Sequence, residues 1–357
     1  MEIVGIDLFS GAGGLSLGAQ EAGIRVALAI EADRHAALTY AHNLGSTEVL
    51  LGDIRMVTKS QLSKVALGAA ITIVFGGAPC QGFSYSNQRT RNVLNEGNWL
   101  YLEFLRIVSI CRPDWVVFEN VKGIKDTEKG VFLADLLNRL SGLGYEVSAR
   151  LLNAADFGVP QCRERLFVIG SAAGLIPELA PTSHRVVTVG EAIRDLPSLA
   201  NGASTNWRRY KSSGQSEYSR LMRGDQRTSS NHLVTRNADH IVRRYRHIPQ
   251  GGNWKYIPDN LMGSYRQTNL DLHTGLYRRL HVDRTSVPIG NYRKNMLIHP
   301  VQERGLSVRE AARLQSFPDW YEFKGSIGFQ QQQVGNAVPP LLANAVFAAI
   351  VAASGGA

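Results

Sequence analysis

Cys80 is the residue whose surroundings point most directly to chemistry. It lies in the segment Ala78–Ser84 (APCQGFS), which follows an apolar stretch, Ile71–Phe75, and the pair Gly76-Gly77. A strand in that stretch would end just before Cys80, and open α/β sheets bind ligands at the carboxyl ends of their strands. A thiolate on such a turn can act as a covalent nucleophile. The alternative is a buried structural cysteine, which is the commoner fate of an arbitrary one.

Three charged residues elsewhere in the chain have a spacing that suits the same kind of site. Glu119 comes directly after the apolar stretch Trp115–Phe118, so we expect it at the same edge as Cys80. A carboxyl group in such a cleft can keep its proton and donate a hydrogen bond. Arg163 and Arg165 share one side of an extended chain, where two guanidinium groups can orient a carboxylate or a phosphate. The alternatives are a solvated helix cap for Glu119 and a surface ion-pair ladder for the arginines.

A glycine-rich turn indicates a nucleoside-binding site. The segment Asp7–Gly14 (DLFSGAGG) continues an apolar stretch that begins at Ile3, and its glycines would let a ligand approach the backbone closely. Glu31 follows Gly11 by 20 residues, at the end of the next apolar stretch, where an acid can bind ribose hydroxyls. Asp53 ends a third stretch and can accept a hydrogen bond from an adenine amino group. The spacing differs from G-x-G-x-x-G, and the alternative is a plain tight turn.

The elements that must position these residues alternate between strands and helices. Strands are expected at Ile3–Leu8, Val26–Ile30, Glu48–Leu51, Ile71–Phe75 and Trp115–Phe118, with a late hairpin of Glu146–Leu152 and Leu166–Gly170. Helices are expected at Leu15–Glu21, Asp33–Asn43, Phe132–Leu143, Leu306–Gln315 and Pro339–Ala352. This alternation predicts an α/β fold with a doubly wound, mostly parallel sheet. We expect residues 1–183 and 327–357 to form the catalytic domain, and residues 184–326 a smaller, irregular domain.

The positive charge of the chain is concentrated in one internal segment. The net charge is +9, but residues 184–300 contain 19 Lys and Arg against 8 Asp and Glu. The same segment holds seven of the nine histidines and nine tryptophans and tyrosines. Basic residues interleaved with aromatic ones suit a nucleic acid whose bases are read. The alternative is a solubilising surface.

Cysteine usage and hydropathy restrict the class of protein. Cys80, Cys111 and Cys162 are the only cysteines, which argues against a disulfide framework and fits a reducing compartment. They lack zinc-ligand spacing, so no metal is expected. From composition we expect no apolar run of membrane-spanning length, and the amino terminus has no basic signal region. We therefore expect a cytoplasmic protein, associated with the nucleoid through DNA, that has no membrane partner.

Taken together, these motifs resemble those of the DNA (cytosine-5)-methyltransferases, of the bacterial type found in restriction-modification or related defence systems. The matching blocks occur in the family's order at Asp7–Gly14, Glu31, Gly52–Ile54, Gly76–Ser84, Phe118–Val121, Gln161–Arg165, Arg309–Pro318 and Gly335–Pro340. The basic segment falls outside the blocks and corresponds to the family's variable target-recognition region. Ala78 stands where the family often has proline, and Tyr85–Trp99 differs from commoner members.

The resemblance implies an S-adenosylmethionine-dependent methyltransferase fold and a set of roles. S-adenosylmethionine, with S-adenosylhomocysteine as product, would be bound by Phe9, Ser10, Gly11, Gly13, Gly14, Glu31, Asp53, Ile54, Pro79, Leu100, Asn336 and Val338. The catalytic residues would be Cys80, Glu119, Arg163 and Arg165. Ser84–Asn98 would close over a cytosine flipped out of specific double-stranded DNA. A monomer is expected, with a cognate restriction endonuclease or defence system as its functional partner.

Two other functions remain open at this point. The first is methylation of cytosine in RNA by the same scaffold, since some relatives act on transfer RNA; a recognition segment longer than a hundred residues favours duplex DNA. The second is a catalytically inactive DNA-binding regulator, which would be expected to lack Cys80 or Glu119, and both are present.

Overall fold

The computed structural model describes residues 2–63, 71–79, 99–125, 130–183, 185–214, 216–263, 274–290, 292–293 and 296–355. Cys80 and the segment 80–98 that it begins lie outside the described residues, so the roles predicted there stay predictions.

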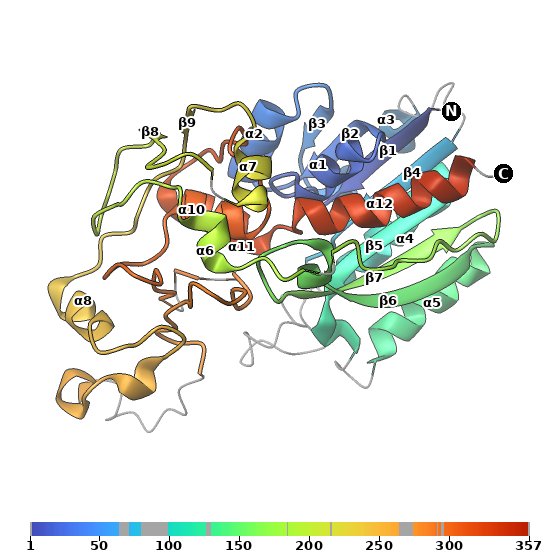
Figure 1. Cartoon of the computed structure of the whole chain (residues 1–357). Helices are drawn as coiled ribbons and strands as arrows, with labels where there is room; N and C mark the ends of the chain where they lie inside the picture. Colours follow the sequence, from blue (N-terminus) through green and yellow to red (C-terminus); the bar gives the residue numbers. More distant parts are fainter. Residues whose placement is uncertain are drawn as a thin grey trace. The chain divides into compact units, whose positions relative to one another are not determined.

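The main sheet is open and mostly parallel, as the sequence predicted (Figure 1). Among the described residues it has seven strands in the order β3-β2-β1-β4-β5-β7-β6. The strands are β1 (Ile3–Leu8), β2 (Arg25–Glu31), β3 (Glu48–Leu51), β4 (Ile71–Gly76), β5 (Trp115–Val121), β6 (Glu146–Asn153) and β7 (Glu164–Ser171). Strands β1 to β5 pair in parallel, and β7 runs antiparallel to both β5 and β6. The strand order reverses at β1, which is where open α/β sheets place their ligands.

Helices cover both faces of this sheet. They are α1 (Gly14–Glu21), α2 (Arg34–Asn43), α3 (Lys59–Ser63), α4 (Leu100–Cys111), α5 (Val131–Gly142) and α12 (Pro340–Gly355). Three short 3₁₀ turns accompany them, η1 (Ile54–Met56), η4 (Lys122–Lys125) and η6 (Ala154–Phe157). All six residues of β1 are buried, which is typical of a parallel strand covered on two sides.

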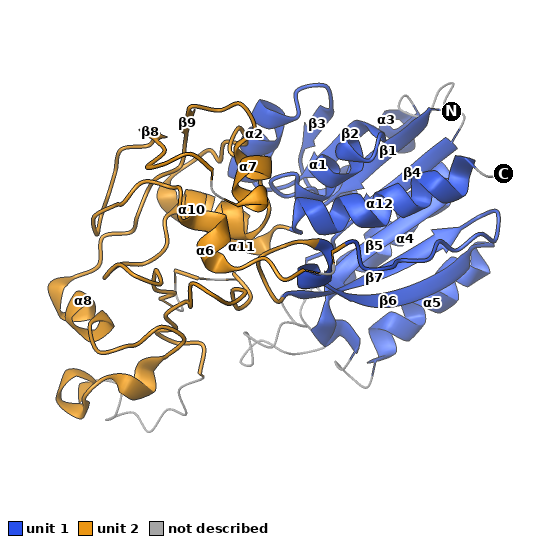
Figure 2. Ribbon diagram, viewed as in Figure 1, with its two compact units in different colours: residues 1–157, 163–182, 338–357 blue, residues 158–162, 183–337 orange. Residues whose placement is uncertain are grey.

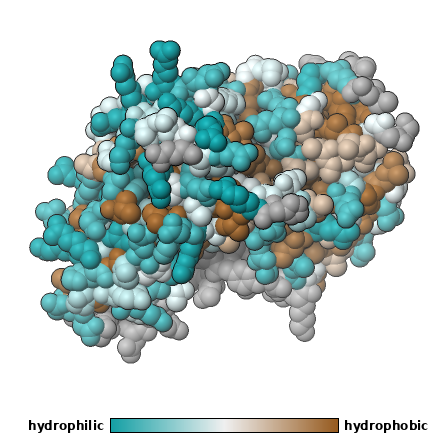
Figure 3. Space-filling model, in the orientation of Figure 1, coloured by the Kyte–Doolittle hydropathy of each residue, from teal (hydrophilic) through white to brown (hydrophobic). Residues whose placement is uncertain are grey.

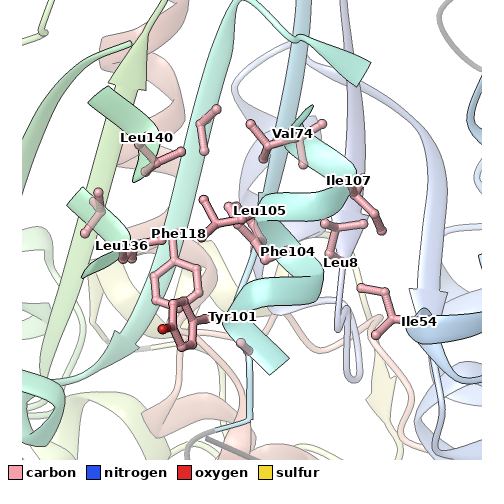
Figure 4. Close-up of a cluster of buried hydrophobic side chains, with 14 of the residues drawn as sticks. Leu8, Ile54, Val74, Tyr101, Phe104, Leu105, Ile107, Phe118, Leu136 and Leu140 are labelled. Atoms are coloured by element: carbon pink, nitrogen blue, oxygen red, sulfur yellow. The ribbon is translucent and has the colours of Figure 1, made fainter. Parts of the chain in front are cut away.

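A large apolar cluster fills the side of the sheet that α4 and α5 cover (Figure 4). Phe104 of α4 packs edge to face against Phe118 of β5, with ring centroids 5.1 Å apart. Ile54 of η1 belongs to the same buried cluster, so the turn that follows Asp53 is fixed to the core of the sheet. Burial of large aliphatic and aromatic side chains such as these stabilises the fold by about 1.5–3 kcal/mol each.

The opposite side of the sheet is covered by α1 and α12. Phe75 of β4 meets Phe347 of α12 with ring centroids 4.8 Å apart. The two helices approach so closely that a Cβ atom on Gly18 would lie 2.5 Å from Cβ of Ala343. The carboxyl-terminal helix is therefore part of the core that holds β1 and β4 in place.

Gly18→Ala is expected to destabilise the protein by about 1–3 kcal/mol, because the added methyl group forces α1 and α12 apart. The matched control is Gly142→Ala in α5, where a Cβ atom meets nothing within 4 Å, and it should change stability by less than about 1 kcal/mol. Urea unfolding of both variants measures the difference. Equal stability of the two variants would contradict the close packing of α1 on α12.

One helical stretch in the described residues, Ile327–Gly355, is long and apolar enough to cross a membrane by length and composition, contrary to the sequence-based expectation. Half of its most apolar window is buried inside the protein, and the stretch consists of two elements, α11 and α12. Since Phe347 and Ile350 of α12 are fully buried against the sheet, the apolar character of α12 is explained as that of a core helix.

The chain divides into two compact units (Figure 2). Unit 1 comprises residues 1–157, 163–182 and 338–357, and unit 2 comprises residues 158–162 and 183–337. Compared with the predicted boundaries, the segments 158–162 and 327–337 group with unit 2 rather than with the sheet. The predicted assignment of catalysis to one domain and target recognition to the other stays a prediction.

Unit 2 contains short elements joined by long irregular segments. They are α6 (Val189–Ile193), α7 (Glu217–Arg223), α8 (Asp239–Tyr245), α10 (Val308–Leu314), α11 (Ile327–Asn336), the two-stranded sheet of β8 (Arg208–Arg209) and β9 (Thr228–Ser229), and the 3₁₀ turns η7 (Trp254–Tyr256) and η8 (Asp259–Leu261).

Buried ion pairs hold the elements of unit 2 together. Arg313 of α10 donates to both carboxylate oxygens of Asp319 at 2.7 and 2.6 Å, and its Nη atoms reach Asp195 at 3.0 and 3.2 Å. Tyr210 also donates to Asp319, at 2.6 Å. Since Arg313 pairs with both Asp319 and Asp195, each charged group of this network has an oppositely charged partner, which is the condition under which buried ions are tolerated.

Candidate active site

The glycine-rich turn after β1 has a backbone that few residue types can adopt. Phe9, Gly11 and Gly13 all have positive φ, of 57°, 55° and 88°. Glycine visits this region freely, but a phenylalanine there is uncommon and costs conformational energy. Gly13 then serves as the N-cap of α1. A strained residue of this kind between a strand end and a helix start is typical of a ligand-binding turn.

Glu31, at the end of β2, is tied to this turn. Its Oε2 accepts a hydrogen bond from the backbone N–H of Gly11 at 2.7 Å, and its Oε1 accepts one from Asp33 at 2.7 Å. Burial raises the pKa of Glu31, and the hydrogen bonds from the backbone oppose that shift. Each carboxylate oxygen has a further lone pair with which to accept a hydroxyl. The structure thus brings Glu31 and the glycine turn together, as the sequence suggested.

A buried polar chain beneath the turn was not assigned a role from the sequence. Ser16 donates to Oδ2 of Asp7 at 2.6 Å, and the hydroxyl of Tyr40 donates to Ser16 at 2.7 Å. Burial raises the pKa of Asp7 well above its ordinary value. Within the described residues, Oδ1 of Asp7 and Oγ of Ser10 are buried without a hydrogen-bond partner. The signal in the sequence was an acid within the otherwise apolar strand Ile3–Leu8.

Asp53 lies at the same edge of the sheet, just after β3. Its carboxylate accepts from the backbone and the guanidinium of Arg55, with the closest contact at 2.5 Å. The hydrogen bonds from Arg55 lower the pKa of Asp53 to about 2, so this exposed carboxylate is an acceptor at neutral pH. An acceptor is what the predicted contact with an adenine amino group requires.

Glu119 of β5 forms the centre of a second group. The antiparallel pairing with β7 sets Glu119 opposite Phe167, which puts Arg165 diagonally across on the same face. Nε of Arg165 lies 2.9 Å from Oε1 of Glu119. Burial raises the pKa of Glu119, and the charges of Arg165 and Arg163 oppose the shift without cancelling it. The two arginines and the acid predicted from separate motifs therefore converge on one point of unit 1.

The end of β4 is fixed against this group. A Cβ atom on Gly77 would lie 2.7 Å from Oε2 of Glu119, so a larger residue would displace the acid. The side-chain amide of Asn120 donates to the carbonyl of Ala78 at 3.3 Å. Neither the contact of Gly77 with Glu119 nor the hydrogen bond from Asn120 to Ala78 was foreseen from the sequence. All four residues nevertheless lie in blocks that the sequence analysis singled out. The segment that precedes Cys80 in the chain is thus held directly beside Glu119.

The remaining residues predicted to bind the cofactor differ in their burial and in the unit to which they belong. Leu100 begins α4 and packs partly against the apolar cluster, Ile54 and Val338 are buried, and Pro79 is exposed. All four belong to unit 1. Asn336 is an exposed residue at the end of α11 in unit 2. Its predicted contact with the cofactor therefore stays a prediction.

Comparisons with known proteins agree with this arrangement. The fold resembles a prophage-encoded E. coli protein described as a candidate DNA modification methyltransferase, with a TM-score of 0.81 and 27% identity over 99% of this chain and 100% of that chain. It also resembles the S. pombe Dnmt2 methyltransferase, with a TM-score of 0.62 and 13% identity over 99% of each chain. The fold is therefore that of a methyltransferase with an open, mostly parallel sheet.

The sequence comparisons narrow this class to one family. The family described as C-5 cytosine-specific DNA methylase matches residues 3–352. The type II methyltransferase M1.HphI of Haemophilus parahaemolyticus is 36% identical, over 98% of this chain and 87% of its own length, and M.XorII of Xanthomonas oryzae is 34% identical, over 96% and 83%. The chain belongs to the C-5 cytosine-specific DNA methylase family, and its activity is methylation of cytosine at C5 in DNA.

Proposed function

We propose that the protein transfers a methyl group from S-adenosylmethionine to a cytosine flipped out of a specific duplex DNA sequence, through a covalent adduct with Cys80. The observation that supports this most directly is the buried pair of Glu119 and Arg165, fixed against the Gly77-Ala78 segment that leads to Cys80. A buried acid with a raised pKa beside two guanidinium groups suits a site that binds and polarises a heterocycle.

The described residues of unit 1 fit the donor. The strained turn at Phe9, the unpartnered atoms of Asp7 and Ser10, and the carboxylates of Glu31 and Asp53 all lie at the carboxyl edge of β1, β2 and β3. The residues of unit 1 proposed to hold the donor are Phe9, Ser10, Gly11, Gly13, Gly14, Glu31, Asp53, Ile54, Pro79, Leu100 and Val338, and the role predicted for Asn336, in unit 2, stays a prediction. When bound, S-adenosylmethionine supplies the electrophilic methyl group that C5 of the activated cytosine takes up.

The protein's task is to make C5 reactive, because C5 of an aromatic cytosine is a poor nucleophile. In the proposed mechanism, the thiolate of Cys80 adds to C6 and the electron pair of the C5–C6 double bond becomes available at C5. Glu119, in the protonated form that burial favours by raising its pKa, donates to N3 and accepts from the exocyclic amine. Arg165 and the more peripheral Arg163 offset negative charge near O2. Removal of the C5 proton by a base then restores the double bond and expels the thiolate.

Duplex DNA hides C5 and C6 of cytosine within the stack, so the base must be extruded at a cost of a few kcal/mol. We assign duplex recognition to unit 2, whose face in Figure 3 carries mainly hydrophilic residues and whose residues hold the positive excess of the chain. Side chains in the major groove can distinguish all four base pairs, whereas arginine contacts to phosphate carry no sequence information.

The function is tested by incubating the protein with S-adenosylmethionine and unmethylated genomic DNA and mapping 5-methylcytosine by bisulfite sequencing. Methylation of one short sequence is expected, with transfer RNA left unmodified in a parallel reaction. Methylation of transfer RNA but not of DNA would overturn the assignment of the substrate. Because the relatives are type II methyltransferases, we also propose that a restriction endonuclease recognising the same sequence accompanies the protein in its host cytoplasm.

Neutralising exposed arginines of unit 2 is expected to weaken DNA binding and flatten its dependence on salt. For Arg209, Arg227 and Arg246 changed together to glutamine, the slope of log K against log salt should fall by about 0.9 for each phosphate that is no longer neutralised. The control is Arg25→Gln, at the opposite end of β2 from the candidate site, which should leave the slope unchanged. Fluorescence anisotropy at several salt concentrations measures the slopes, and an unchanged slope in the triple variant would exclude these arginines from the interface.

A further inference from the structure

Arg106 of α4 contacts the turn that carries Asp53. Its Nη2 donates to the carbonyl of Ile54 at 2.9 Å, and its Nη1 donates to the carbonyl of Val57 at 3.1 Å. These two carbonyls border η1, the turn that starts directly after Asp53. One guanidinium group therefore spans the turn from its first residue to the residue after its last.

The position of Arg106 on its own helix is also fixed. Its Nε forms an ion pair with Glu103, one helical turn earlier, at 2.7 Å. The side chain of Arg106 is only one-third exposed, so it is more constrained than a surface arginine. Since Glu103 uses Nε and the two carbonyls use the Nη atoms, the planar fork is engaged on both sides.

The contacts of Arg106 link the turn to another element of unit 1. Asp53 is partly exposed, and its carboxylate accepts hydrogen bonds from Arg55 of the same turn. Ile54 and Val57 anchor the turn through their buried side chains, but apolar contacts are not directional. The hydrogen bonds from Arg106 are directional, and they link the turn to the helix whose first residue is Leu100.

We propose that Arg106 is a positioning residue for the cofactor site: it fixes the Asp53 turn relative to α4 so that the Asp53 carboxylate meets the adenine amino group. This inference rests on the proposed use of S-adenosylmethionine. It assigns to Arg106 the discrimination between a purine with an amino group at position 6 and one with an oxygen there, because a displaced carboxylate neither binds the amino group nor repels the oxygen.

The test measures binding rather than activity. Dissociation constants for S-adenosylhomocysteine and for its inosine analogue, S-inosylhomocysteine, are determined by isothermal titration calorimetry without DNA. In the wild type the adenine compound should bind more tightly. Arg106→Gln, which removes both carbonyl contacts, should weaken its binding by about tenfold and reduce the preference over the inosine compound by a similar factor. Arg106→Lys keeps the positive charge but lacks the planar guanidinium group, so it should also weaken binding of the adenine compound and reduce the preference over the inosine compound.

Two control variants separate this role from general effects. Glu103→Gln removes the ion pair but leaves the carbonyls bonded, and Arg139→Gln removes an arginine of α5 that forms an exposed ion pair at i,i+4. Both should retain the wild-type preference. If Arg106→Gln weakens both ligands equally, or leaves the preference intact, the positioning role is wrong. If the wild type binds neither compound, the proposed cofactor itself is wrong.

Discussion

Replacing Cys80 by serine is expected to lower methyl transfer by at least about 10⁴-fold, since a hydroxyl in place of the thiolate cannot form the adduct at C6 under neutral conditions. The dissociation constant for the target duplex should stay within a few fold of the wild-type value. The thiolate takes part in the proposed chemical step, whereas the proposed contacts with the duplex are made by unit 2. Transfer of a labelled methyl group into a short duplex measures the first quantity, and anisotropy measures the second.

The chain provides two matched controls for Cys80. Cys111 is partly buried in α4, where burial raises the pKa of its thiol to about 11, and Cys162 is exposed with its sulfur 3.0 Å from the hydroxyl of Thr285. Cys111→Ser and Cys162→Ser should both retain turnover. Loss of activity in one of these variants with full activity in Cys80→Ser would move the nucleophile to another cysteine.

The adduct can also be observed directly. A duplex with 5-fluorocytosine at the target position should become permanently attached to the wild-type protein in the presence of S-adenosylmethionine, because fluorine at C5 cannot leave as the proton does. The complex should survive denaturing electrophoresis, and Cys80→Ser should not form it. Failure of the wild type to form it on a duplex that it methylates would exclude the covalent route.

The architecture was predictable from the sequence because apolar strands covered on both sides stand out as short apolar runs. The predicted strand Glu48–Leu51 coincides with β3, and Ile71–Phe75 is one residue short of β4. The strand predicted at Trp115–Phe118 was too short, since β5 continues to Val121. Glu119 and Asn120 interrupt the apolar pattern, and only their contacts with Arg165 and Ala78 explain why polar residues are buried within a strand.

Some of the elements that were not predicted from the sequence are stabilised by contacts distant in the chain. Helix α11 was missed because its buried face contains Gln330, Gln331 and Gln333, which no apolar pattern identifies. These glutamines are satisfied by hydrogen bonds, such as that from Gln331 to Thr235 at 2.9 Å. Likewise, the role of Asp7 beneath the glycine turn depends on Ser16 and Tyr40, which the fold alone brings together.

The second large effect is expected for Glu119→Gln, which should slow methyl transfer by about 10²–10⁴-fold. Glutamine has nearly the same shape as glutamate and still fits beside Gly77. A reduced rate would therefore reflect the loss of the acidic proton of Glu119 rather than a change in packing. The substitution also changes the contact between residue 119 and Arg165, so folding is checked by circular dichroism. Single-turnover methylation with saturating donor and DNA measures the chemical step.

The pH dependence identifies the active form of Glu119. Because burial raises its pKa, the carboxyl remains protonated to a higher pH than an ordinary glutamate and loses its proton only as the pH rises through that value. If the protonated form donates to N3, the wild-type rate should fall on the alkaline side of that pKa, and Glu119→Gln should lack this decline.

A matched control is Glu164→Gln. Glu164 is half-exposed at the start of β7 and forms an ion pair with Lys122 at 3.0 Å, so it shares the sheet and the residue type with Glu119 but not its burial. This variant should keep both the wild-type rate and the wild-type pH profile. A rate for Glu119→Gln within about threefold of the wild type, or an unchanged alkaline decline, would remove Glu119 from the chemistry and leave it as the buried partner of Arg165.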